Sequence, residues 1–98
     1  MSEIKVFKTT SGEDILTEVV KVEDTHYVLK DPVVLVLQET ETGVKVGLVP
    51  YMPYAVQPVA LYANAVAAEA IPSDAMISEY KRVFSPIVTQ PQSIIVPK

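Results

Sequence analysis

The sequence of 98 residues contains no cysteine and no tryptophan, and it has only one histidine. The absence of cysteine excludes a disulfide framework and a thiolate metal site. No glycine-rich phosphate loop is present, and no serine is placed for the histidine to activate. The paired carboxylates at 13–14 and 23–24 lie in expected turns, where they serve solubility. We therefore expect no catalytic residue, no metal and no cofactor, and predict that the protein is not an enzyme.

Positive charge is also scarce. Lysine and arginine number 8 against 12 acidic residues, the net charge is −4, and no basic run occurs. Residues 1–50 hold nine acids and five bases, whereas residues 51–98 hold three of each. This pattern excludes the basic footprint of a typical duplex-DNA-binding protein. Any binding of nucleic acid must therefore rely on a local patch or on aromatic stacking.

Residues 46–68 contain no charge at all and are long enough in principle to cross a membrane. Three prolines within this stretch would break a helix, and Gln57 and Asn64 would lie in lipid. We therefore expect no membrane-spanning segment. No signal peptide is recognisable, which predicts a cytoplasmic location, in the host cell if the protein is phage-encoded.

Hydrophobic residues, in contrast, are abundant. They make up 49% of the chain, charged residues make up 20%, and the mean hydropathy is +0.27. The runs at 32–38 and 59–70 are apolar on both faces, whereas a sheet with one wet side should alternate. A domain this small cannot cover so much apolar surface by itself. We expect a homo-oligomer in which part of that surface is subunit interface.

Five β-branched runs predict strands, with turns near Gly12 and Gly43. The runs are IKVF, ILTEVVKV, YVLKDPVVLVLQ, VKVGLV and VALYANAVAAEA, although the alanines of the last run would also suit a helix. Asp31-Pro32 predicts a bend or bulge inside the third strand. A helix is predicted over 73–85, because Ser73 is a good N-cap and apolar residues recur at spacings of three and four. The apolar positions of this helix are Met76, Ile77, Tyr80, Val83 and Phe84.

These elements predict a single domain over 1–98 that is mainly β. Residues 3–70 form a small, strongly bent, five-stranded antiparallel barrel. The helix at 73–85 follows it, and residues 86–98 form an extended C-terminal arm. Ile94, Ile95 and Val96 make the arm too apolar for a free end, so we expect it to pack on its own barrel or on a neighbouring subunit.

The start of the chain resembles the first motif of the Sm/LSm (Hfq-type) family of small β-barrels. In that motif a glycine follows strand one, spaced hydrophobic residues come next, and an acid precedes a hydrophobic start to strand three. The matching residues are Gly12, Ile15, Val19, Val22, Asp24, Tyr27 and Leu29. The segments VGLVPYMPYA and SEYKRVF are similar to a divergent Sm-like group in marine phage and metagenomic sequences.

The resemblance implies a ring of five to seven identical subunits joined edge to edge by strands, with nucleic acid as the ligand. Three departures limit what can be transferred. Val28 stands where the family usually has asparagine, and Lys45-Val46-Gly47 replaces its Arg-Gly pair. That shift turns the basic residue to the opposite face of a strand. The family's helix also precedes the barrel, so its base-pocket residues are not assigned here.

The segment VPYMPYAVQP offers the first candidate site. In a polyproline conformation, Tyr51 and Tyr54 would lie on one side and could stack on bases without strong positive charge. The alternative, which we favour, is that the rings plug the end of the barrel while the prolines fix a corner.

The segment EDTHYVLK offers the second candidate. In an Sm-like barrel this loop would line the pore, where His26 or Tyr27 could stack and Lys30 could meet phosphate. We favour the simpler interpretation of a polar hairpin loop. Asp24 and His26 supply only two metal ligands, which do not make a site.

Lys81 and Arg82 are the third candidate, because around a ring they would form a basic band. Basic residues are equally typical of a helix C-terminus. Our leading hypothesis is a ring-forming Sm-like protein that binds single-stranded nucleic acid, RNA before DNA, through pore or surface loops. The alternative is a non-enzymatic structural or adaptor oligomer that binds protein partners through its Pro-Tyr loop and apolar tail.

Overall fold

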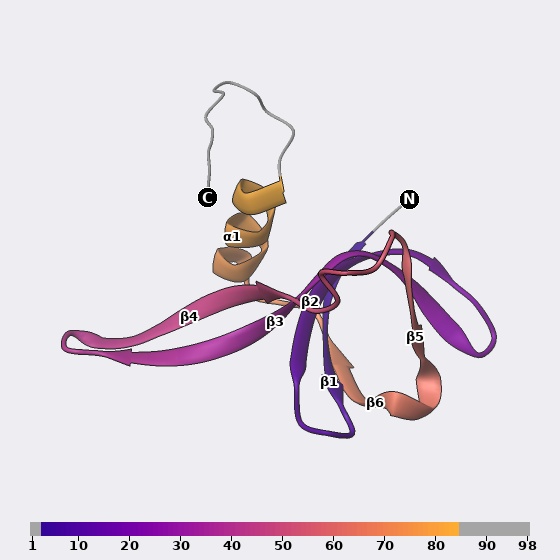
Figure 1. Ribbon diagram of the computed structural model, residues 1–98, viewed down its shortest axis with the longest axis horizontal. Helices are drawn as coiled ribbons and strands as arrows, with labels where there is room; N and C mark the ends of the chain where they lie inside the picture. Colours follow the sequence, from indigo (N-terminus) through magenta and orange to yellow (C-terminus); the bar gives the residue numbers. More distant parts are fainter. Residues whose placement is uncertain (1–2, 85–98) are drawn as a thin grey trace.

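The computed structural model describes residues 3–84, which form a six-stranded antiparallel sheet and one α-helix (Figure 1). A 3-10 turn, η1 (Ala63–Ala65), joins the last two strands, and the helix α1 spans Asp74–Phe84. No helix in this part of the chain is long and apolar enough to cross a membrane. The strands are β1 (Glu3–Thr9), β2 (Asp14–Val22), β3 (His26–Thr40), β4 (Gly43–Pro50), β5 (Val59–Tyr62) and β6 (Val66–Ala70).

The long strand β3 organises the sheet. The strand order is β4-β3-β2-β1-β6, and β5 also pairs with β3. Along one edge β3 pairs with β2, and along the other its first residues pair with β5 and its later residues with β4. The prediction of a mainly β antiparallel domain with one C-terminal helix is therefore confirmed.

The prediction of a closed barrel of five strands is wrong, because residues 59–70 do not form one strand. They divide into β5, which pairs with β3, and β6, which pairs with β1, and no pairing between these two strands closes the described sheet. At η1 the chain bonds to loops instead: the Ala63 N–H donates to Thr25 O (2.9 Å), and the Thr10 N–H donates to Ala65 O (2.8 Å). The alanines of this stretch have little strand preference to resist that break.

A bulge at Asp31-Pro32 redirects β3, as the sequence predicted. The register with β2 shifts so that two residues of β3, Asp31 and Pro32, lie between pairs that enclose only Thr17 on β2. Asp31 has a positive φ of 52°. Beyond the bulge, β3 and β4 leave the body of the protein as a projecting hairpin, here called the β3–β4 arm (residues 35–48; Figure 1).

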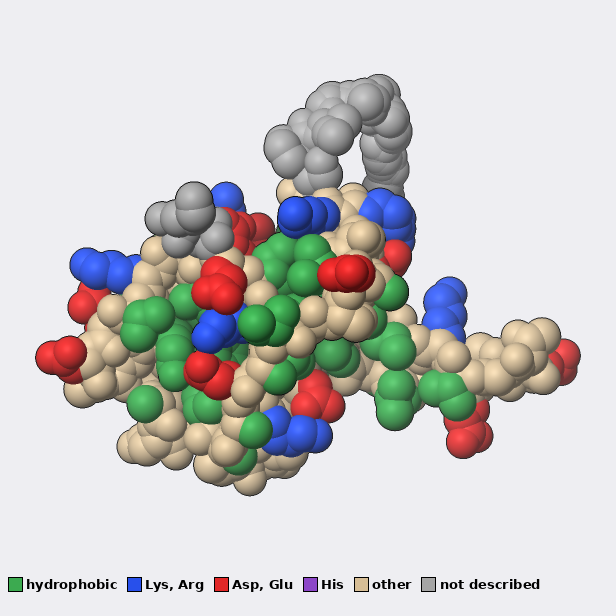
Figure 2. Space-filling model, turned by 180° about the vertical axis from the view of Figure 1, so that it is seen from behind, with side chains coloured by type: hydrophobic (Ala, Val, Ile, Leu, Met, Phe, Trp, Pro, Cys, Tyr) green, Lys and Arg blue, Asp and Glu red, His purple; other side chains and the backbone are tan. Residues whose placement is uncertain are grey.

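The β3–β4 arm carries hydrophobic side chains into solvent. Figure 2 shows hydrophobic side chains along the part of the arm nearest the body. Leu37 is 72% exposed and Val44 is 65% exposed. Leu35 and Leu48 at its base pack against the core under α1, but among the described residues no second layer covers the rest of the hairpin.

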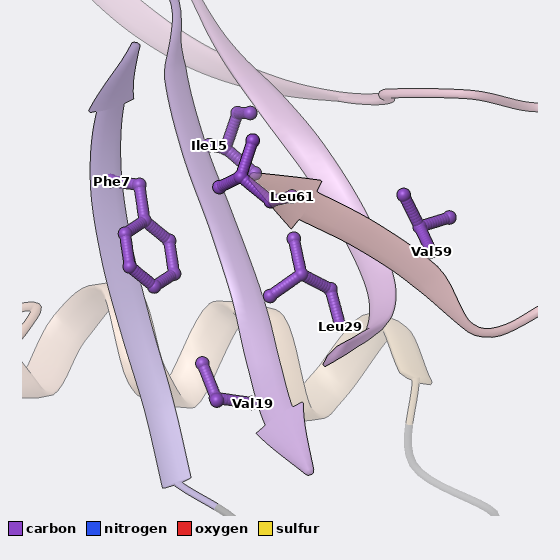
Figure 3. Packing of buried hydrophobic residues seen from close by; sticks show 6 residues of the cluster. All are labelled: Phe7, Ile15, Val19, Leu29, Val59 and Leu61. Carbon is purple, nitrogen blue, oxygen red and sulfur yellow. The ribbon is translucent and has the colours of Figure 1, made fainter. Parts of the chain in front are cut away.

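The first core lies between β1, β2, β3 and β5 (Figure 3). The side chains point toward one another on one side of the sheet, while α1 passes behind the strands. Alternation along the strands produces this arrangement, since every second residue faces the same side. The fully packed members are Phe7, Ile15, Val19, Leu29, Val59 and Leu61.

The second core lies on the opposite side of the sheet, under α1. It consists of Leu16, Val33 and Tyr80, with Met76 packed against it. These residues explain why the open sheet holds one helix: apolar positions on both faces of β2 and β3 need cover, and the helix supplies it on one side.

The helix begins as predicted. The Ser73 hydroxyl oxygen accepts the N–H of Met76 (3.3 Å), so Ser73 is the N-cap. The predicted apolar face is buried only in part, because Val83 and Phe84 at the end of the helix remain exposed. Residue 85 and the expected arm at 86–98 lie outside the described residues.

Candidate nucleic-acid interface

The candidate residues at the start of β3 point to the two opposite faces of the sheet, because side chains alternate along a strand. Tyr27 and Leu29 belong to the first core, so His26, Val28 and Lys30 point to the opposite face. His26 and Lys30 are thus brought to one surface, and Tyr27 is separated from them.

Strand β5 places an aromatic ring beside His26. Tyr62 lies directly opposite His26 in the strand register, and the two ring centroids are 5.3 Å apart with a tilt of 48°. Tyr62 is 56% exposed. The His26 Nδ1 also lies 3.1 Å from the Thr25 hydroxyl oxygen. The result is an aromatic pair anchored to two hydrogen-bonded strands, in which Tyr62 is exposed and His26 is half-buried.

Tyr62 is not among the candidate residues predicted from the sequence. A signal was present, because in the VALY segment Val59 and Leu61 are buried while Ala60 and Tyr62 are exposed. Reading residues 59–70 as one strand that is apolar on both faces hid this alternation.

We call the surface formed by His26, Val28, Lys30, Ala60 and Tyr62 the outer β3–β5 face. Within residues 3–84 no salt bridge engages Lys30. Two charges border this face from β2, because Glu18 lies opposite Lys30 and Lys21 lies opposite Val28. Lys21 is paired with Glu23 (3.0 Å). The face therefore combines one exposed ring, one half-buried ring and a lysine that has no salt bridge within residues 3–84.

Tyr27 instead joins β3 to β6 across the open side of the sheet. Its ring lies 4.8 Å from that of Phe7, and its hydroxyl donates to Glu69 Oε1 (2.8 Å). Lys5 Nζ lies 3.0 Å from the other Glu69 carboxylate oxygen. The Tyr27 hydrogen bond and then Lys5 lower the pKa of Glu69, and the same hydrogen bond raises the pKa of Tyr27. This tyrosine is committed to a polar bridge, not to an open surface.

The two tyrosines of the Pro-Tyr loop have different environments. Tyr51 packs against the first core, and its N–H donates to Pro32 O (2.9 Å). The chain then turns, with the Ala55 N–H donating to Met52 O (3.0 Å), and Tyr54 is left 83% exposed. The rings therefore do not form one stacking surface, and the packing interpretation fits Tyr51.

Lys81 and Arg82 lie on the exposed side of the last turns of α1. Arg82 is paired with Glu79, which neutralises much of its charge. No ion pair engages Lys81 in the described range. The helix thus contributes one free cation near its C-terminal end.

In the part of the chain that the structure describes, no three His, Cys, Asp or Glu side chains could together hold a metal ion. Neither a protein-family model nor a curated protein matches this chain. The described residues form a small antiparallel sheet without a feature specific to Sm-like proteins, so that resemblance remains a prediction.

Proposed function

We propose that this protein is a non-enzymatic homo-oligomer that binds single-stranded nucleic acid on the outer β3–β5 face. The observation that carries the proposal is the pairing of the exposed Tyr62 ring with the half-buried His26 ring, on the face that also holds Lys30. Bases stack on aromatic rings in a manner that tolerates different sequences, and a nearby lysine can meet phosphate. Compared with the expectation from sequence, Tyr62 takes the place of Tyr27 and Tyr51.

The charge of the protein limits how such binding can occur. The net charge is −4, and Glu18 stands opposite Lys30 on the neighbouring strand. Few phosphates can then be neutralised by each subunit, so stacking supplies most of the affinity. The logarithm of the binding constant should fall by only ~0.7 per phosphate contacted for each unit of log salt.

Replacing Tyr62 tests the proposal, with Tyr54 as the matched control. Tyr62→Ala should raise the dissociation constant for labelled oligo(U) by about 5- to 150-fold, because stacking on one ring contributes roughly 1–3 kcal/mol. Tyr54→Ala, which removes an exposed ring from the loop between β4 and β5, should leave it nearly unchanged. Fluorescence anisotropy across a salt series measures both.

Two results would contradict the proposal. One is a wild-type protein that binds neither oligo(U) nor oligo(dU) at low salt, and the other is an equal effect of the two substitutions. A preference for oligo(U) over oligo(dU) would identify RNA as the ligand, since the two differ in the 2′-hydroxyl group.

A second candidate function, that of a structural or adaptor oligomer, is favoured by the β3–β4 arm. Leu37, Val44 and Val46 share one face of the arm, and by register that face continues from Leu35 and Leu48, which pack against the second core. A two-stranded hairpin is marginally stable in water, and a continuous apolar patch marks an interaction site. The arm supports self-association, while the expected count of five to seven subunits remains a prediction.

A further inference from the structure

A groove of about 250 Å³ lies where the bulge in β3, the loop after β4 and the end of α1 meet. Pro32, Met52, Ala55 and Phe84 give it apolar walls, and Asp31 and Gln57 form part of its lining. It lies apart from the residues of the outer β3–β5 face and is not used by the proposed function.

Two of the polar contacts at this groove are made within the protein itself. The Asp31 N–H donates to Gln57 Oε1 (2.9 Å), and Pro32 O accepts the N–H of Tyr51 (2.9 Å). Seven of the nine lining residues are apolar, so a ligand would meet mainly hydrocarbon, which favours apolar side chains over a nucleotide or an ion.

The size of the groove points the same way. Small-molecule sites usually measure about 300–1,000 Å³, so this volume is below that range. It corresponds to about eight water molecules at ~30 Å³ each, which is room for one or two aliphatic side chains. A short apolar segment of polypeptide fits these dimensions.

The chain itself brings such a segment to the groove. Phe84 lines the groove and is also the last described residue, and fourteen residues, 85–98, follow it. The first apolar pair among them is Ile87-Val88, and no charge occurs before Lys98. Ile87 and Val88 can lie no more than about 11–14 Å from Phe84 along an extended chain. We propose that Ile87 and Val88 bind in the groove of their own chain.

The short connection favours this occupant over a second copy. Three intervening residues or fewer tether the pair to Phe84, so its effective concentration at the groove exceeds that of a separate molecule. Bound there, the segment would cover Phe84, which the helix leaves exposed, and would connect α1 to the bulge and to the Pro-Tyr loop.

The absence of cysteine makes the test direct, because two introduced cysteines can form only one intramolecular disulfide. In full-length protein, Ala55→Cys with Val88→Cys should oxidise to an intramolecular disulfide. The matched control is Ala60→Cys with Val88→Cys, since Ala60 is an exposed alanine on β5 outside the groove. Intact mass under non-reducing conditions should show the first pair closing at least about tenfold faster than the second.

Equal closure rates for the two pairs would overturn the proposal. So would disulfide-linked dimers as the sole product of the first pair, because the groove would then hold the tail of another copy. If Ala55→Cys disturbs the fold, a second experiment compares the single variants Val88→Asp and Thr89→Asp. Thermal unfolding should shift to lower temperature for Val88→Asp only, and an equal shift for both variants would also reject the proposal.

Discussion

At the scale of single residues, one buried hydroxyl connects the helix to the bulge. The Tyr80 oxygen lies 2.9 Å from the carbonyl oxygens of Lys30 and Asp31, and it accepts the N–H of Glu18 (3.2 Å). A hydroxyl has one proton, so the two carbonyls share it. These backbone groups lie at the register shift between β2 and β3, and the Thr17 hydroxyl also donates to Lys30 O (3.1 Å).

Removing this hydroxyl should destabilise the protein. Tyr80→Phe keeps the ring in the second core but removes the hydrogen bonds to the Glu18 N–H and the Asp31 carbonyl, which costs about 1–3 kcal/mol. Urea unfolding measures the loss. Tyr54→Phe is the control. Because the Tyr54 hydroxyl is exposed, its removal should change the free energy of unfolding by no more than about 0.5 kcal/mol. Equal unfolding free energies for the two variants would contradict the assigned role of Tyr80.

At the scale of elements, the β3–β4 arm is the feature that is hardest to reconcile with a monomer. β3 and β4 pair throughout the arm, in a register that runs from Val33 opposite Pro50 to Thr40 opposite Gly43. The pairing satisfies the backbone on one edge of each strand, but the apolar face of the arm remains in water. The free energy of hiding that face drives association.

We therefore predict that the arm holds subunits together. Leu37→Thr with Val44→Thr should lower the solution mass, measured by light scattering, because each apolar side chain buried in an interface contributes about 1.5–3 kcal/mol. Threonine keeps a high strand preference, so the hairpin should persist.

Val56→Thr is the control for this prediction, since Val56 is 89% exposed but lies in the loop between β4 and β5. It should leave the mass unchanged. A wild-type protein that is already a monomer would contradict both the prediction and the expectation of a homo-oligomer.

At the scale of the whole molecule, an open sheet is held together by contacts other than strand pairing. The two ends of η1 bond to the loops that precede β2 and β3, and Tyr27 reaches Glu69 on β6. Each side of the sheet has its own core, one formed between strands and one under α1. The free energy of unfolding therefore depends in part on a few hydrogen bonds that titratable side chains make, and so on pH.

We predict that stability falls in alkali. Burial raises the pKa of Tyr80, whereas tyrosine in an unfolded chain ionises near pH ~10. Below that pH the tyrosine is protonated in both the folded and the unfolded state, and Tyr80 makes its full contribution to the free energy of unfolding. Above it the unfolded chain loses a proton that the folded protein retains, so the unfolding free energy decreases as pH rises.

Urea unfolding between about pH 8 and about pH 11 checks this prediction. One retained proton gives a slope of up to about 1.4 kcal/mol per pH unit. Tyr27, whose pKa is raised by its bond to Glu69, adds to the slope in the same direction. Tyr80→Phe should flatten the profile without abolishing it, and an unchanged slope in this variant would contradict the assignment.

Local features of this fold could be predicted from the sequence. The strands up to Pro50, the bulge at Asp31-Pro32 and the N-cap at Ser73 depend on residues close together in the chain. The division of residues 59–70 into β5, η1 and β6 could not be predicted. It depends on hydrogen bonds to Thr25 and Thr10, which lie far away in the sequence.

The candidate site was likewise predictable from the sequence only in part. The sequence by itself determined an acidic, apolar chain with few chemically reactive side chains, and it identified His26 and Lys30 as surface candidates. Only the tertiary structure decided that Tyr27 turns inward to Glu69 and that Tyr62 stands beside His26. Alternation along a strand defines two faces, but which face is covered, and which residue lies opposite, depends on the strand that pairs with it.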